Sequence, residues 1–131
     1  MALPPRGRWL WTPVAAYMGF IFALSSVSNT PAMPGGVDKD LHALLYAGLG
    51  VLLVRARAGG LGREVTIPMV VWAVVVAAAY GVSDECHQWF VPPRQVEAAD
   101  VLADTIGATL AASGLFAWSR VTRAGAPHRP V

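Results

Sequence analysis

Charged residues are scarce in this 131-residue sequence, since Asp, Glu, Lys and Arg make up 14% of it against about 25% in a typical soluble domain. Hydrophobic residues make up 55%, and the mean hydropathy is +0.49. These values exclude a disordered chain, because disorder goes with low hydrophobicity and high net charge. A chain this short also has too much surface for its volume to hide so much apolar area from water. The composition therefore predicts an integral membrane protein.

Cysteine and lysine are nearly absent, with one residue of each, Cys86 and Lys39. A single cysteine excludes an internal disulfide and a multi-cysteine metal site, and we interpret Cys86 as neither a nucleophile nor a metal ligand. The other nine basic residues are arginines scattered along the chain, and the net charge is only +2. No basic run marks a nucleic-acid partner, so none is expected.

Long charge-free stretches predict an all-α fold, a polytopic integral membrane four-helix bundle in one domain over residues 9–120. The predicted spans cover residues 9–27, 38–54, 65–90 and 100–119. The second and fourth spans approach the thickness of the bilayer's hydrocarbon core only if the acids at their starts join the helix. With those acids they are roughly 26 and 30 Å long. Residues 1–8 are predicted to form an N-terminal cytoplasmic segment, and residues 121–131 a cytoplasmic tail.

The distribution of basic residues predicts the orientation in the cell membrane. With four spans, eight arginines fall on one side, and only Lys39 and Arg94 on the other. Because arginine and lysine accumulate in cytoplasmic loops, both termini are expected in the cytoplasm. Seven of the eight acids fall on the opposite, outer side. A secretory signal at Arg6 and Arg8 is the less favoured alternative, because no cleavage site follows the apolar run cleanly.

Polar residues recur at helical spacing near the outer ends of three predicted helices. Residues three, four and seven apart share a helix face, and an acid inside a span costs free energy unless it faces a partner. We therefore expect the stripes to meet in one acid-rich cup at the outer leaflet, with the bases as counter-charges. The predicted ligand-binding residues are Asp38, Lys39, His42, Tyr46, Asp84, Glu85, Gln88, Arg94, Asp100 and Asp104.

Two acids nearby, Asp40 and Glu97, are interpreted as merely solvated. The alternative for the whole set is structural, because buried polar groups also join membrane helices by hydrogen bonds. No metal ligand and no cofactor is assigned. The oligomeric state is left open.

Small residues and tryptophans are interpreted as packing and interface features. Ala103, Gly107, Ala111 and Gly114 predict a close helix contact, and Gly48 and Gly50 predict another. Tryptophans anchor helix ends at the membrane interface, which is the expectation for Trp9, Trp11, Trp89 and Trp118. Trp72 lies inside a predicted span and is expected to pack or to face lipid.

Two motifs resemble the signatures of the VanZ-like family. The first is Asp38-Lys39-x-x-His42-x-x-x-Tyr46. The second is Ser83-Asp84-Glu85-x-His87-Gln88-x-Phe90-x-Pro92-x-Arg94, followed by Asp100-Val101-x-x-Asp104-Thr105-x-Gly107-Ala108. The resemblance runs from about Asp38 to Gly107 and implies a small four-helix membrane fold. The family's namesake contributes to teicoplanin resistance.

The chain departs from the family pattern at two places. Asp104 stands where the family has Asn, which adds an acid to an acid-rich set whose like charges oppose joint ionisation. Pro92-Pro93-Arg94 stands where the family has Pro-Gly-Arg, which stiffens the loop that carries Arg94. Neither departure breaks the pattern.

The leading hypothesis is a protein that binds a glycopeptide antibiotic or a lipid-linked ligand of the cell envelope at the outer leaflet. Carboxylates would accept hydrogen bonds from sugar hydroxyls or amines, while Lys39 and Arg94 would meet phosphate or carboxylate. Trp89 and Phe90 would flank the ligand. Besides the ligand, the lipid bilayer is the expected partner.

The first alternative is a membrane enzyme acting on a lipid headgroup, with a general base among His42, Asp84, Glu85 and Asp104 and with assistance from a metal. The sequence has no nucleophile motif or HExxH signal, which favours a protein without enzymatic activity. A proton-coupled carrier is the second alternative. No charged residue falls in the inner half of a predicted span, so the sequence shows no complete proton pathway.

Overall fold

Four helices make up the computed structural model, which describes residues 5–28, 33, 34 and 36–125. They are α1 (Pro5–Ser25), α2 (Val37–Ala58), α3 (Ile67–Gln88) and α4 (Ala98–Ala124). The described residues contain no strand, so the all-α prediction is confirmed. The predicted end segments 1–8 and 121–131 lie partly outside the described residues, as do the side chain of Arg6 and all of Arg129.

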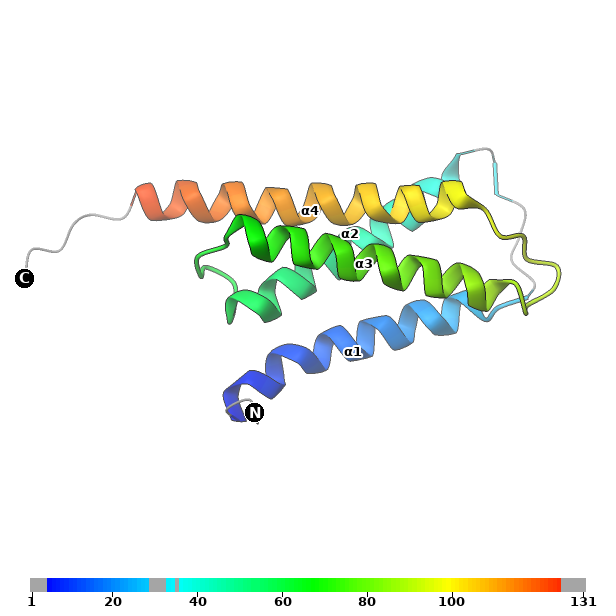
Figure 1. Ribbon diagram of the computed structural model, residues 1–131, viewed down its shortest axis with the longest axis horizontal. Helices are drawn as coiled ribbons and strands as arrows, with labels where there is room; N and C mark the ends of the chain where they lie inside the picture. The colour runs from blue at the N-terminus through cyan, green and yellow to red at the C-terminus, as the bar shows by residue number, and fades with distance from the viewer. Residues whose placement is uncertain (1–4, 29–32, 35, 126–131) are drawn as a thin grey trace, which may run out of the picture.

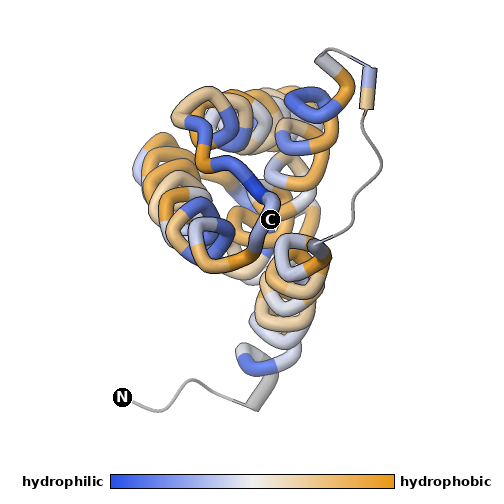
Figure 2. Tube along the Cα trace, turned by 90° about the vertical axis from the view of Figure 1, so that its right-hand side faces the viewer, coloured by the Kyte–Doolittle hydropathy of each residue, from blue (hydrophilic) through white to orange (hydrophobic). Residues whose placement is uncertain are grey.

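Three of the helices, α2, α3 and α4, are long and apolar enough to cross a membrane. Large apolar side chains point outward from them, with Leu44, Val75 and Leu110 each at least 60% exposed. In the view along the bundle, hydrophobic residues make up much of the helical trace (Figure 2). The chain is a multi-pass membrane protein by these features. α1 is not among the three.

Several helices extend beyond the stretches identified in the sequence, because helices end at backbone signals rather than at the first charge. α2 continues past Arg55 to Ala58 and is capped by Gly59, which has a φ of 85°. There the N–H of Gly60 donates to the carbonyl of Arg55 at 2.9 Å, and glycine readily takes this left-handed conformation. α4 continues to Ala124. α3 ends at Gln88, two residues before the expected Phe90.

The closest helix contact joins α2 and α4. A Cβ on Gly107 would overlap the backbone of Ala43, and one on Gly50 would come within 2.9 Å of the carbonyl oxygen of Ala108. Both glycines are predicted from the sequence to lie in close helix contacts, and these distances confirm that. The prediction for Gly114 is wrong, because this residue is exposed and a Cβ added to it would meet no atom within 4 Å. Its face of α4 is turned outward.

α1 leans against the other helices and is joined to them by tyrosines. The hydroxyl of Tyr17 donates to the carbonyl of Leu45 at 2.9 Å, and the hydroxyl of Tyr80 donates to the carbonyl of Met18 at 2.6 Å. Gly48 leaves the space that the Tyr17 ring fills. The start of α1 and the end of α4 lie at one end of the bundle (Figure 1). The opposite end gathers the end of α1, the start of α2, the end of α3 and the start of α4, and we call it the polar end.

Candidate functional site

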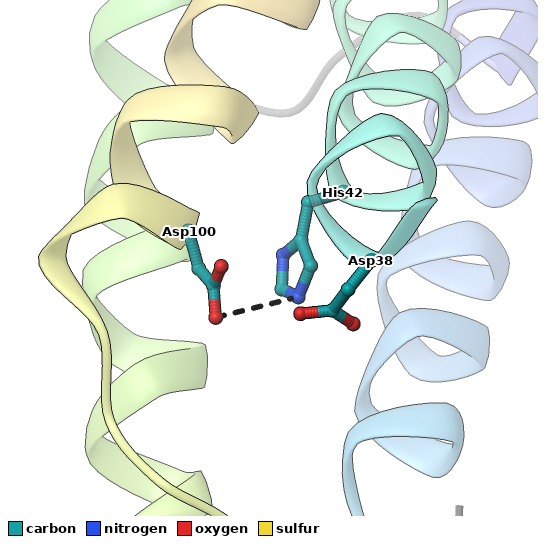
Figure 3. A group of neighbouring side chains, drawn as sticks. All are labelled: Asp38, His42 and Asp100. Atoms are coloured by element: carbon teal, nitrogen blue, oxygen red, sulfur yellow. Dashed lines mark ion pairs between the residues drawn. The ribbon is translucent and has the colours of Figure 1, made fainter. Parts of the chain in front are cut away.

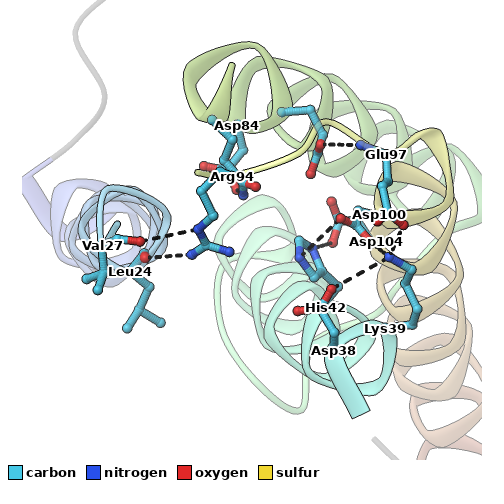
Figure 4. Close-up of polar contacts among 12 residues, drawn as sticks. Leu24, Val27, Asp38, Lys39, His42, Asp84, Arg94, Glu97, Asp100 and Asp104 are labelled. Carbon is cyan, nitrogen blue, oxygen red and sulfur yellow. Dashed lines mark hydrogen bonds and ion pairs between the residues drawn. The ribbon is translucent and has the colours of Figure 1, made fainter. Parts of the chain in front are cut away.

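The polar stripes of α2, α3 and α4 face one another at the polar end (Figure 4). Antiparallel neighbours bring the start of one helix beside the end of the next, so the first turns of α2 and α4 meet the last turns of α3. Here lies a cavity of about 750 Å³, within the range of about 300–1,000 Å³ typical of small-molecule sites. From the predicted set, it is lined by Asp38, His42, Tyr46, Asp84, Gln88, Arg94 and Asp100.

Three predicted residues do not line the cavity but contact or neighbour residues that do. They are Lys39, Glu85 and Asp104. Lys39 bridges α2 and α4, because its Nζ donates to Asp100 Oδ1 and, at 2.6 Å, to Glu97 Oε2. Asp38 Oδ2 is 3.6 Å from the same ammonium group. Lys39 thus has the counter-charge role predicted from the sequence.

His42 is held in one orientation by a buried carboxylate. Its Nδ1 is 2.9 Å from Asp104 Oδ1, and Asp104 has no exposed surface. The opposite ring nitrogen, Nε2, is 3.8 Å from Asp100 Oδ2. His42 also forms a compact group with Asp38 and Asp100, whose donor atoms could hold a metal ion. The arrangement leaves one imidazole nitrogen directed between two carboxylates.

Two carboxylates of α3 are buried beside these groups. Asp84 is 5% exposed, and one of its oxygens, Oδ2, is 3.4 Å from the amide nitrogen of Gln88. Glu85 is 3% exposed, and its Oε2 accepts a hydrogen bond from the backbone N–H of Glu97 at 3.0 Å. The second bond fixes the loop between α3 and α4 against the end of α3.

Several buried polar atoms at this end have no hydrogen-bond partner among the residues that the structure describes. Buried polar groups in native proteins are normally hydrogen-bonded, and an unsatisfied one costs roughly 1–3 kcal/mol. The atoms are Ser25 Oγ, Tyr46 OH, Asp84 Oδ1, Glu85 Oε1 and Asp104 Oδ2. Among their residues, Ser25, Tyr46 and Asp84 also line the cavity. The cavity wall therefore offers acceptors and hydroxyls that a polar ligand or water can satisfy.

Arg94 makes contacts that the sequence did not reveal. Its guanidinium group donates to the carbonyls of Leu24 and Val27, each at 3.2 Å (Figure 4). These carbonyls lie at and just beyond the C-terminal end of α1, where a cation is favourable. Arg94 thus joins the α3–α4 loop to α1, although it still lines the cavity.

Sequence reasoning missed the contribution of α1 and of Glu97 to this region. Ile21, Leu24 and Ser25 form one wall of the cavity, but they are ordinary apolar or small residues with no sequence signal. Glu97 is expected from the sequence to be merely solvated, yet it pairs with Lys39 and lines the cavity. Glu97 lies three residues before Asp100, and this spacing could have indicated that the two acids share one face.

The aromatic residues expected to flank a ligand lie outside the cavity lining. Trp89 and Phe90 are 73% and 80% exposed. Their position beyond the last turn of α3 turns them outward. Cys86 is also exposed.

Comparison with known proteins gave one finding. A family model described as VanZ/LLP1 matches residues 10–119, which is most of the chain and includes all four helices in large part. No curated protein and no solved structure matched.

Proposed function

The chain belongs to the VanZ/LLP1 family, and from that premise we propose that it binds the polar group of an amphiphilic cell-envelope ligand in the cavity at the polar end. The ligand class is a lipid-linked envelope precursor or a lipid-bearing glycopeptide such as teicoplanin. In this proposal the polar end faces the outer side of the cell membrane. The polar group enters the cavity while the lipid chain stays in the bilayer.

The proposal rests mainly on buried oxygen atoms that have no hydrogen-bond partner among the described residues. These atoms belong to residues around a cavity large enough for a small-molecule ligand. Asp84 Oδ1 and Tyr46 OH belong to residues that line it and have no partner within the described part of the chain. A carboxylate in this state accepts hydrogen bonds strongly. Sugar hydroxyls and protonated amines supply the matching donors, and both occur on the proposed ligands.

The cavity lining also suits an amphiphile because it contains both apolar and acidic side chains. Leu24, Leu41 and Leu45 contribute apolar surface next to the acidic residues. Such a mixed lining, with a few placed polar groups in a mainly apolar wall, is typical of small-molecule sites. An apolar path at membrane depth accommodates the part of a lipid next to its headgroup.

The test is direct binding to the purified full chain in detergent. Labelled teicoplanin and a labelled lipid-linked precursor are titrated separately, so that the two sources are distinguished. We expect one of them to bind, and Asp84→Asn to weaken its binding by about tenfold or more, since a hydrogen bond to a charged group is worth about 1.5–3 kcal/mol.

Glu64→Gln is the matched control, because Glu64 is an exposed acid that pairs with Arg123 at the other end of the bundle. It should leave the affinity unchanged. If neither ligand binds, or if Asp84→Asn and Glu64→Gln bind equally well, the proposed function is wrong.

A further inference from the structure

We propose that a divalent transition-metal ion binds between α2 and α4 at Asp38, His42 and Asp100. One donor atom from each of the three side chains lies within 4.8 Å of the other two. Figure 3 shows the imidazole of His42 directed into the space between the two carboxylates. Asp38 and His42 are one helical turn apart on α2, and Asp100 comes from the first turn of α4.

The geometry of His42 matches that of a metal ligand. Its Nε2 is 3.8 Å from Asp100 Oδ2, which is too long for a hydrogen bond. Two donor atoms that each lie about 2.1 Å from the same ion are at most about 4.2 Å apart. The separation therefore fits two ligands of one ion with little movement of either side chain.

Asp104 is a positioning residue for this site. Metal-ligating histidines commonly donate their other ring N–H to a carboxylate, which fixes the tautomer and the ring orientation. Asp104 Oδ1 lies 2.9 Å from His42 Nδ1 and is supplied by a fully buried side chain. This contact leaves the lone pair of Nε2 free for an ion.

A separate observation points to a site for a polar ligand beside these three residues. Tyr46 and Asp84 are 1% and 5% exposed and line the same cavity, yet Tyr46 OH and Asp84 Oδ1 have no partner among the described residues. Three protein ligands leave coordination positions open on a metal ion. Water molecules or ligand oxygens that occupy those positions would lie in the same cavity as these two unsatisfied groups.

The charge balance also favours a cation here. Asp38, Asp84 and Asp100 line the cavity, with Asp104 directly behind His42. Lys39 pairs with Asp100 Oδ1 and Glu97 and lies 3.6 Å from Asp38 Oδ2, while Arg94 donates to backbone carbonyls. The described residues at this end thus retain an excess of acids over bases. One imidazole with two carboxylates favours Zn²⁺ or Mn²⁺ over Mg²⁺ and Ca²⁺, which prefer oxygen ligands throughout.

The experiment uses the full chain, purified in detergent and freed of metal with a chelator, with Mn²⁺ alone as the probe. Titration followed by electron paramagnetic resonance should show about one bound ion per chain. Electron spin echo modulation should show a coordinated imidazole nitrogen. Asp38→Asn, His42→Gln and Asp100→Asn should each weaken Mn²⁺ binding at least about tenfold, and His42→Gln should abolish the nitrogen signal.

Two further variants make the result specific. Asp40→Asn is the matched control, since Asp40 is an exposed acid two residues from Asp38 on α2, and it should bind Mn²⁺ as the natural chain does. Asp104→Leu should keep the ion but weaken binding about tenfold to a hundredfold, with an altered nitrogen coupling because the imidazole loses its orientation.

The proposal goes beyond ligand binding and is tested without any ligand, so the two can fail separately. It is overturned if the natural chain binds no Mn²⁺, or if the nitrogen signal is absent. It is also overturned if only Lys39→Met binds the ion, because the lysine ammonium would then be the cation that the natural site holds. Equal loss of affinity in Asp40→Asn would show nonspecific attraction to acids and would likewise overturn it.

Discussion

Gly107 occupies a position of α4 where the structure leaves no room for a side chain. A Cβ there would overlap the backbone of Ala43 in α2, and backbone atoms, unlike a flexible side chain, yield little. Gly107 is adjacent to Ala108, which is fully buried and faces Gly50. These residues set the short distance between α2 and α4, and that distance lets Lys39 and His42 reach the acids of α4.

Gly107→Ala should therefore destabilise the bundle. Overpacking of a tight contact costs about 1–3 kcal/mol, so we expect the free energy of unfolding in detergent to fall by about that amount. Gly114→Ala is the control, because it adds a methyl group on an open face of the same helix and removes a poor helix former. The interpretation is contradicted if the two variants unfold alike.

The environment of His42 is compatible with two roles, metal ligand and general base. Its orientation by Asp104 suits a metal ligand, and the same orientation suits a general base. Enzymatic action on a lipid headgroup and proton-coupled transport both stay alternatives to the proposed function. The structure identifies Asp104 as the carboxylate that orients the His42 ring.

At the scale of elements, α1 packs least closely against the other helices, and side-chain contacts join it to them. Tyr17 and Tyr80 hold its middle, and Arg94 holds its end. His87 also stacks on Phe22, with ring centroids 4.3 Å apart, and contacts Ser26 at 2.9 Å. Because α1 forms one wall of the cavity, these ties control the width of the candidate site.

Arg94→Met should loosen the end of α1. It removes two hydrogen bonds to carbonyls at that end, each worth about 0.5–1.5 kcal/mol, while it keeps a long apolar side chain. We expect amide hydrogen exchange near the end of α1 to accelerate by about fivefold to tenfold, with exchange in α2 and α4 unchanged. The measurement is hydrogen exchange in detergent followed by mass spectrometry.

Arg63→Met is the control for this variant, because Arg63 is an exposed arginine in the loop at the opposite end. It should leave the exchange in α1 as in the natural chain. Unchanged exchange in Arg94→Met would mean that the tyrosine and His87 contacts hold α1 without Arg94.

At the scale of the whole molecule, the polar end and the arginine-rich end are opposite each other. Seven of the eight acids and Lys39 belong to the polar end or the segments next to it, while Arg55, Arg57 and Arg63 lie at the other end. The start of α1 and the end of α4 share that other end (Figure 1). This arrangement supports the prediction that both termini are cytoplasmic, which labelling can test.

The single natural cysteine provides the probe for topology. Cys86 is exposed and lies three residues from Trp89, near the end of α3 at the polar end. A membrane-impermeant maleimide added to intact cells should label the natural chain and not Cys86→Ser. Glu64→Cys in the Cys86→Ser background, at the other end, should be labelled only after permeabilisation. The reverse pattern would place the polar end in the cytoplasm.

Local features of the sequence determined the class of the protein and its helices. The scarcity of charge predicted a membrane protein, and the apolar stretches predicted four helices, because helix formation and partition into lipid depend on consecutive residues. The spacing of Asp38, His42 and Tyr46 also placed them on one face, since the helical period is local. The charge pattern did not predict the helix ends correctly. α2 continues through Arg55 and Arg57 because its end is set by the capping residue Gly59.

Only the tertiary structure decided which of these polar groups meet. The contacts of His42 with Asp104 and of Lys39 with Glu97 join residues about sixty positions apart, and they depend on how closely α2 approaches α4. The sequence assigned Arg94 to a ligand, whereas the packing of α1 supplies it with two carbonyls. Helix packing is set by the shapes of whole faces, so periodicity within one helix does not reveal the partner of a side chain.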